Sequence, residues 1–116
     1  MATNKCIFCQ IAAGEIPADI YYQDDDVIAF RDIHPVAPTH LLVIPKKHIA
    51  TANDFSEQDA VLIGKLSVTA ARIAKDLRVD EKGYRLVMNC NRDAGQTVFH
   101  VHMHLLAGRS FTWPPG

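Results

Sequence analysis

Three histidines alternate with apolar residues in the segment HVHMHLLAG, residues 100–108. A β-strand has a side-chain period of two, so His100, His102 and His104 are expected on one strand face, about 7 Å apart. Neutral imidazole is a good nucleophile near pH 7, and it is also a common ligand for transition metals. Imidazoles that lie close together disfavour one another's protonation, which keeps an attacking nitrogen free. The spacing therefore indicates a nucleophilic site or, as the alternative, a metal-dependent hydrolase that uses the histidines as ligands.

A second group of reactive side chains is the pair Cys6 and Cys9 in the sequence CIFC. In an intracellular protein, this spacing is typical of a redox pair or of half a metal site, and it also arises by chance. A thioredoxin-like redox pair should follow a strand within a βαβ unit, a context that the front of this chain lacks. The sequence therefore favours the metal half-site over the redox pair.

The sequence resembles the histidine-triad family, and within it the HINT branch of nucleotide-binding proteins. The run from His100 to Leu106 matches the signature His-x-His-x-His-x-x with apolar residues at x. Its companions occur in the family's order over nearly the whole chain: FRDI, PTHLLVIPKKHI, GQTVF and WPPG. The resemblance implies a hydrolase that splits purine nucleoside phosphoramidates into a nucleoside monophosphate and an amine. His102 would be the nucleophile and would carry the nucleotide covalently, with no cofactor required for the chemistry.

The same resemblance implies roles for the other site residues. The catalytic set would be His102, His104, His100, His40 and Thr97, with Thr97 at a position where the family commonly has serine. Asp32 would accept hydrogen bonds from the ribose hydroxyls. The base would lie between Phe8, Phe30 and Ile33, although ordinary core packing is an equal alternative for these three residues. The phosphate would bind to His102, His104 and the loop residues Asn89, Gly95, Gln96 and Thr97.

Some histidine-triad proteins bind zinc through a cysteine pair and two histidines. The resemblance therefore implies that zinc would lie between Cys6, Cys9, His48 and His100. Four protein ligands close a tetrahedral zinc site, so this ion would be structural.

Few elements are needed to position these residues. The patterns predict a short helix over 6–13 and one long helix over 56–77, which begins at a capping box of Ser56 and Asp59. Strands are predicted over 20–22, 27–33, 40–44 and 84–90, followed by the histidine strand, with a hairpin turn at QDDD. This is an α+β fold with a five-stranded antiparallel sheet. The resemblance implies that two chains pair into a ten-stranded sheet, with the tail 111–116 reaching toward the partner's site.

Composition and charge limit the number of domains, the kinds of partner and the cellular location that can be expected. The 116 residues are enough for one domain, residues 1–116, and 48% apolar with 22% charged residues is ordinary for a globular protein. A net charge of −1 and the lack of a long apolar run predict no binding to nucleic acid or membrane. The first residues, MATNKCIFCQ, have no apolar signal core, and three cysteines suit a reducing compartment, so a cytoplasmic protein is expected. The partners that the resemblance implies are a purine nucleotide and a second copy of the chain. The alternative function is non-catalytic nucleotide binding or scaffolding.

Overall fold

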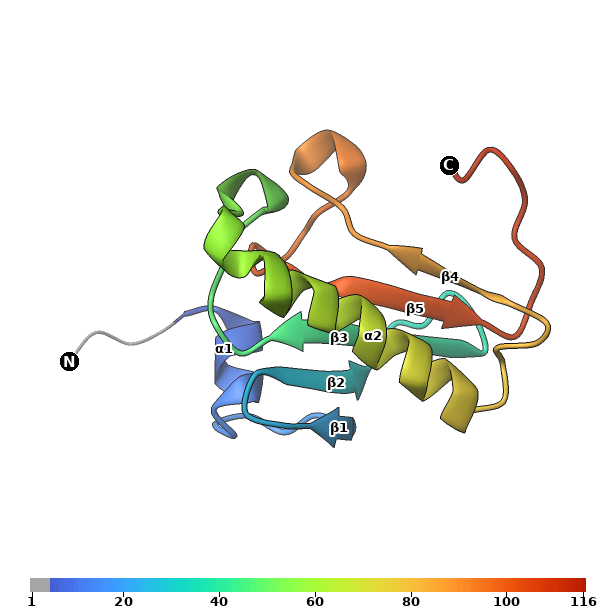
Figure 1. Ribbon diagram of the computed structural model, residues 1–116, viewed down its shortest axis with the longest axis horizontal. Coiled ribbons are helices and arrows are strands. Elements are labelled where there is room, and N and C mark those ends of the chain that lie inside the picture. Colours follow the sequence, from blue (N-terminus) through green and yellow to red (C-terminus); the bar gives the residue numbers. More distant parts are fainter. Residues whose placement is uncertain (1–4) are drawn as a thin grey trace.

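The computed structural model describes residues 5–116 as an α+β fold built on a five-stranded antiparallel sheet (Figure 1). The sheet order is β1-β2-β3-β5-β4. Its strands are β1 Ile20–Gln23, β2 Val27–Arg31, β3 Thr39–Pro45, β4 Tyr84–Val87 and β5 Met103–Ala107. The predicted fold class is confirmed.

The central strand β3 is buried from His40 to Pro45. Neighbouring strands pair along both edges of β3, and the sheet is covered on both faces, so all five side chains of its sequence HLLVI are buried. Alternate residues enter different cores. Leu41 and Val43 belong to the core beneath the long helix, whereas Leu42 and Ile44 belong to the core on the opposite face.

The long helix α2, Ala60–Asp76, lies across β3, β5 and β4 on one face of the sheet (Figure 1). Leu66, Ala70 and Ile73 form its buried stripe, as the 3.6-residue periodicity predicts. The predicted capping box of Ser56 and Asp59 is present, but it begins a 3-10 turn, Glu57–Asp59, and the α-helix starts one residue later.

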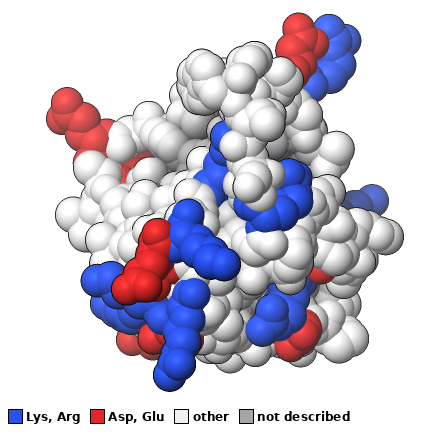
Figure 2. Space-filling model, turned by 90° about the vertical axis from the view of Figure 1, so that its right-hand side faces the viewer, with Lys and Arg blue, Asp and Glu red and all other residues white. Residues whose placement is uncertain are grey.

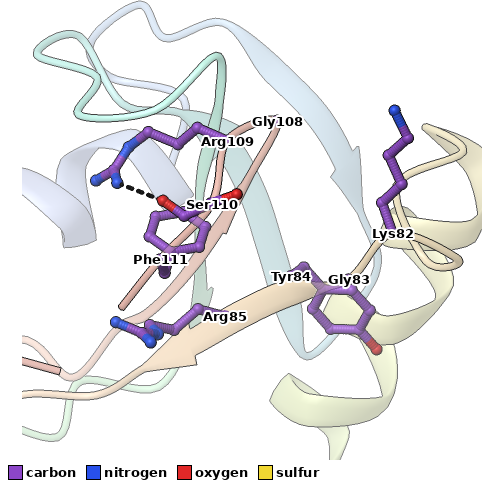
Figure 3. A pocket seen from close by; sticks show the side chains of 8 residues that line it. All are labelled: Lys82, Gly83, Tyr84, Arg85, Gly108, Arg109, Ser110 and Phe111. Carbon is purple, nitrogen blue, oxygen red and sulfur yellow. Dashed lines mark hydrogen bonds between the residues drawn. The ribbon is translucent and has the colours of Figure 1, made fainter. Parts of the chain in front are cut away.

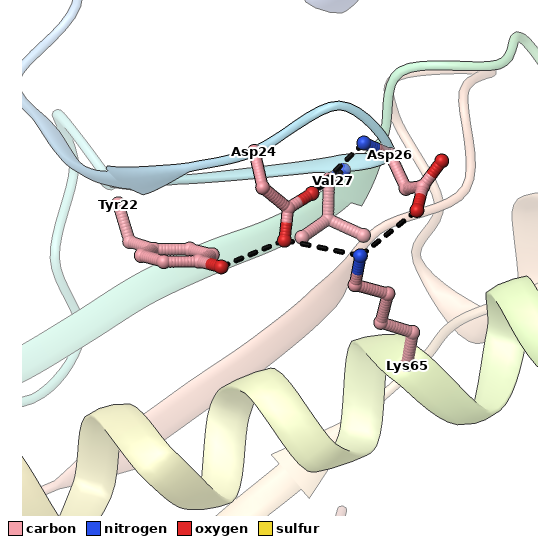
Figure 4. A network of polar contacts seen from close by, with 5 residues as sticks. All are labelled: Tyr22, Asp24, Asp26, Val27 and Lys65. Carbon is pink, nitrogen blue, oxygen red and sulfur yellow. Dashed lines mark hydrogen bonds and ion pairs between the residues drawn. The ribbon is translucent and has the colours of Figure 1, made fainter.

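The β1–β2 hairpin is fastened to α2 by a polar network (Figure 4). Asp24 Oδ1 accepts hydrogen bonds from the backbone N–H groups of Asp26 and Val27, which fixes the predicted turn. Tyr22 donates to Asp24 Oδ2 at 2.7 Å, and Lys65 of α2 contacts the carboxylates of Asp24 and Asp26 at 3.1 and 2.8 Å. Burial works against the Asp24 carboxylate, but these donors outweigh it and hold the Asp24 pKa well below its usual range.

The opposite face of the sheet is covered by the short helix α1, Ile7–Ala12. Phe8 and Ile11 are its buried residues, and they pack on a patch of β2 and β3 formed by Ile28, Phe30, Leu42 and Ile44. Cys6 caps the helix, because its sulfur accepts the N–H of Cys9 at 3.4 Å. The two cysteines therefore lie at the start of α1, beside the second core.

Three strands are shorter than predicted, whereas β1 and β3 are slightly longer: β2 ends at Arg31, β4 ends at Val87, and the histidine strand begins only at Met103. The last difference follows from Pro45. Val43 pairs with Met103, so the register carried two residues further would set Pro45 opposite Val101, and proline has no N–H to bond. Val101 instead donates to the carbonyl of Ile49 at 2.8 Å. The prediction that all three histidines share a strand face was therefore wrong, because only His104 lies in the strand.

Gly108 follows β5 with a φ of +93°, and it lies against the loop of residues 32–38. A Cβ at this position would lie 2.8 Å from the Pro38 Cβ, so no other residue allows this approach. Within residues 5–116, no helix combines the length and the apolar character needed to cross a membrane.

Candidate active site and metal centre

The three histidines of the triad divide between two neighbouring clusters. His100 groups with Cys6, Cys9 and His48, whereas His104 groups with His40 and Asp32. The His102 ring lies 5.0 Å from the His104 ring and 5.2 Å from the Phe8 ring, measured between ring centroids. Among the described residues, then, the triad does not gather into one set of metal ligands, as a metal-dependent hydrolase built on all three would need.

The hydrogen bonds of His102 determine which of its ring nitrogens is free. Nδ1 lies 2.8 Å from the carbonyl oxygen of His100. A carbonyl can only accept, so Nδ1 carries the hydrogen, and in the neutral ring Nε2 then keeps its lone pair. The side chain is 7% exposed, so its orientation is fixed by packing as well as by this bond. The neutral form of His102 thus presents a nucleophilic nitrogen, Nε2, whose direction is fixed.

Two successive hydrogen bonds fix the tautomers of His40 and His104 in the same way. The N–H of Val36 donates to His40 Nδ1 at 3.1 Å, which leaves the hydrogen of neutral His40 on Nε2. His40 Nε2 lies 2.9 Å from His104 Nδ1, so His104 accepts there and carries its own hydrogen on Nε2. Burial lowers the pKa of His40, and it lowers the pKa of His104 to about 4, so both rings are neutral at pH 7. His104 therefore offers an N–H beside the nucleophile.

Asp32 lies just beyond the end of β2, where its two carboxylate oxygens have different neighbours. Oδ1 accepts the N–H of His34 at 2.8 Å, and Oδ2 lies 3.4 Å from His40 Nε2. The carboxylate is therefore next to the His40–His104 pair. The Asp32 side chain remains 19% exposed, so the carboxylate is partly accessible from solvent.

The loop before the triad is held together by Gln96, which is 4% exposed. Its side-chain amide donates to the carbonyls of Ala50 and Val98, at 2.8 and 3.1 Å, and its Oε1 accepts the N–H of Asn91. Both amide hydrogens are thus engaged, one within the loop and one with the segment after β3, and one bond would have to open before the Gln96 side chain could reach a phosphate. Thr97 and Gly95 are exposed, and Asn89 is half-buried.

The three residues proposed for the base differ in burial. Phe8 and Phe30 are 6% and 4% exposed, and their rings meet edge to face at 5.4 Å. Ile33 is 85% exposed, on the bend after β2. Phe8 and Phe30 are therefore core residues, and of the two it is Phe8 whose ring contacts His102.

The Cys/His cluster, defined as Cys6, Cys9, His48 and His100, has the dimensions of a tetrahedral zinc site. His100 Nδ1 lies 3.4 and 3.5 Å from the sulfurs of Cys6 and Cys9 and 3.2 Å from His48 Nδ1, which is 3.3 Å from the Cys9 sulfur. Typical zinc bond lengths place tetrahedral ligands about 3.4 Å apart for two nitrogens and about 3.6 Å apart for nitrogen and sulfur.

The His100 ring is also prepared for a metal. Its Nε2 lies 2.7 Å from the carbonyl of Pro45 and donates to it, so the Nδ1 lone pair faces the other three ligands. Burial lowers the pKa of His100, which keeps the ring unprotonated. Both ring nitrogens of His100 are thus engaged, and its backbone carbonyl is the group that contacts His102.

A basic pocket at the end of the sheet was not anticipated from the sequence. A cavity of about 630 Å³ lies between the start of β4 and the turn after β5 (Figure 3). The guanidinium groups of Arg85 and Arg109 lie 5.1 and 4.3 Å from the Phe111 ring, and Arg85 donates to the carbonyl of Thr112 at 2.9 Å. Several lysine and arginine side chains gather at this end of the molecule (Figure 2). No local motif marks these residues, because the pocket arises only when the tail folds back.

Comparison with known proteins agrees with this geometry. The HIT domain family matches residues 13–111. The chain is 54% identical over 106 residues to the purine nucleoside phosphoramidase of Escherichia coli, covering 91% of this chain and 89% of that protein. A HIT family hydrolase from Legionella pneumophila has a similar structure, with a TM-score of 0.95, 54% identity and coverage of 97% of this chain and 100% of that one.

A zinc-bound histidine triad family protein from Mycobacterium smegmatis is a more distant structural neighbour. It aligns with a TM-score of 0.77 and 34% identity, over 90% of this chain and 76% of that chain. Together, the fold, the site and these matches define a histidine-triad protein. The chain belongs to the HIT domain family.

Proposed function

We propose that this protein hydrolyses purine nucleoside phosphoramidates, with His102 as the nucleophile. The observation that carries the proposal is the hydrogen bond from His102 Nδ1–H to the His100 carbonyl. In the neutral ring, this bond leaves Nε2 with a lone pair whose direction is fixed. The 54% identity to the purine nucleoside phosphoramidase of Escherichia coli supports the choice of substrate. Scaffolding alone would require no such nucleophile.

The reaction would proceed in two displacements at phosphorus. In the first, His102 Nε2 forms a bond to phosphorus, the bond from phosphorus to the amine breaks, and the amine takes up a proton from water as it leaves. In the second, water attacks the same phosphorus and gives up a proton, which replaces the one taken by the amine, and the bond to His102 breaks, which releases the nucleoside monophosphate. His104 Nε2–H would donate to a phosphoryl oxygen, together with Thr97, Asn89 and the backbone near Gly95 and Gln96.

Wild-type protein is therefore expected to turn over an adenosine phosphoramidate steadily. A rapid acid quench should trap one nucleotide per chain on the peptide that contains residues 100–104, which mass spectrometry would locate. A nucleotide trapped on His104 or His100 would contradict the assignment of the nucleophile. Tight binding of adenosine monophosphate without turnover would instead identify a non-catalytic nucleotide-binding protein.

The proposal also includes a bound zinc ion and a cellular compartment, the cytoplasm. Cys6, Cys9, His48 and His100 would hold zinc with no open ligand position, so the ion would fasten α1 to the loop after β3 and would take no part in the chemistry. Thiolate ligands must stay reduced, which suits the cytoplasm. The whole chain, residues 1–116, would then act as one domain, with the two cysteines supplied from outside the matched residues 13–111.

We also propose that two chains pair through β4 and α2 into a ten-stranded sheet. β4 is an edge strand, and exposed apolar side chains lie on both elements, Leu86 on β4 and Val68 on α2. The tail, in which Trp113 is 84% exposed, would then reach toward the partner's site. Light scattering at micromolar concentration should show a dimer for wild type and a monomer for Val68→Asp. Val61→Asp, in the first turn of α2, is the control and should remain dimeric. A monomeric wild type would contradict the pairing.

A further inference from the structure

His100 connects the Cys/His cluster to the nucleophile through a single residue. Its ring supplies Nδ1 to the cluster, and its carbonyl oxygen accepts the Nδ1–H of His102 at 2.8 Å. The residue is fully buried, and its Nε2 is anchored to the Pro45 carbonyl. A displacement of the His100 ring would therefore move the carbonyl that fixes the tautomer of His102.

Phe8 provides a second connection between the same two sites. It lies between Cys6 and Cys9 in the first turn of α1, and its ring contacts the rings of both His100 and His102, at 6.0 and 5.2 Å. A helix of six residues is too short to be stable by itself. The position of Phe8 therefore depends on its packing against β2 and β3 and also on what holds the two cysteines at either side of it.

From these contacts we infer that the Cys/His cluster, with its metal, positions the nucleophile in addition to stabilising the fold. This inference rests on the proposed role of His102. When the cluster is intact, the His100 carbonyl and the Phe8 ring hold His102 in the tautomer that has Nε2 free. When a ligand is lost, His102 would sample both tautomers and several ring orientations, so fewer molecules would be ready to attack phosphorus. Mutation of residues that orient a metal's ligands typically lowers metal affinity or activity by about 10-fold to 100-fold, and we expect the coupling in this direction to be of similar size.

His48→Ala is the informative variant, because His48 is the exposed ligand and the other three ligands remain. His48→Cys is the conservative variant, since it restores a four-ligand set. Lys46→Ala is the matched control on the same segment, outside the cluster. Each variant would be compared with wild type at a temperature where all are folded, and wild type would also be measured with zinc removed by a chelator and then restored.

Three quantities would be measured: zinc content, kcat for an adenosine phosphoramidate, and the ¹⁵N chemical shifts of His102, which report the tautomer. His48→Ala and zinc-free wild type should show kcat lowered by about 10-fold and averaged His102 shifts. His48→Cys, Lys46→Ala and zinc-restored protein should match wild type. If His48→Ala does not fold, zinc-free wild type and His48→Cys decide the question.

Unchanged kcat and His102 shifts in a protein that has lost its zinc would overturn the inference and leave the cluster with a structural role alone. Wild type that binds no zinc would overturn it as well. The tautomer measurement needs no substrate, so the inference stays testable even if the wild-type protein hydrolyses no phosphoramidate, a result that would refute only the proposed function.

Discussion

Replacement of His102 with alanine is expected to lower kcat by about four orders of magnitude or more, while adenosine monophosphate still binds. The variant loses the only side chain proposed to bond to phosphorus. The apolar wall of Phe8 and Phe30 and the carboxylate of Asp32 remain in place, so most ground-state contacts persist. Stopped-flow assays would measure turnover, and calorimetry would measure binding of the nucleotide.

His34→Ala is the matched control for this experiment. His34 is an exposed histidine whose contact with Asp32 is made by its backbone N–H, which alanine retains. It should keep wild-type kcat. His102→Gly with added imidazole should recover a trace of activity, because the vacated pocket can direct a free nucleophile. Activity in His102→Ala within ten-fold of wild type would show that another group attacks the substrate.

Loss of the metal is expected to have the second large effect, this time on stability. Purified protein should contain about one zinc per chain, and Cys9→Ala should contain none. Structural zinc sites in small peptides contribute about 10–16 kcal/mol of apparent binding free energy. If even about 3 kcal/mol of this stabilises the folded state, Tm falls by more than about 10 °C in a chain of this size.

Elemental analysis and calorimetry would test the metal's contribution to stability. Cys90→Ala is the control, because Cys90 is a half-buried cysteine outside the cluster. It should keep its zinc and lose far less stability. Metal-free wild type with an unchanged Tm would contradict the proposed zinc site.

Much of the fold could be predicted because local signals agree with the tertiary structure. Ser56 and Asp59 form the expected box, and Leu66, Ala70 and Ile73 form the expected stripe. The error at the histidines has a different origin. Alternation was interpreted as one continuous strand, but the strand's partner contains Pro45, whose missing N–H is a long-range effect that depends on register. The sequence contains this signal, yet it gains meaning only once the two strands are paired.

Prediction of the site from the sequence meets the same limit, because it also depends on contacts between distant segments. Cys6, Cys9, His48 and His100 could be grouped through the family resemblance, and the structure brings them together. The contacts that decide the chemistry, from Val36 to His40 and from His102 to the His100 carbonyl, are made by backbone atoms. Every residue has such atoms, so side-chain identity does not reveal which ones will serve. The basic pocket lined by Phe111 cannot be predicted from the sequence for a related reason, since it depends on how the tail folds.

Gly108 has a consequence for the recognition of active members among distant relatives. Its contact with Pro38 and the bond from Arg109 to the Val36 carbonyl, at 3.0 Å, hold the loop whose amide selects the tautomer of His40. A relative could keep all three triad histidines and still lose this arrangement if a bulkier residue stood at the position of Gly108. Sequence searches that score only the histidine signature would count such a protein as an enzyme. A glycine two residues after the last apolar position of the signature is therefore a useful additional criterion for assigning activity.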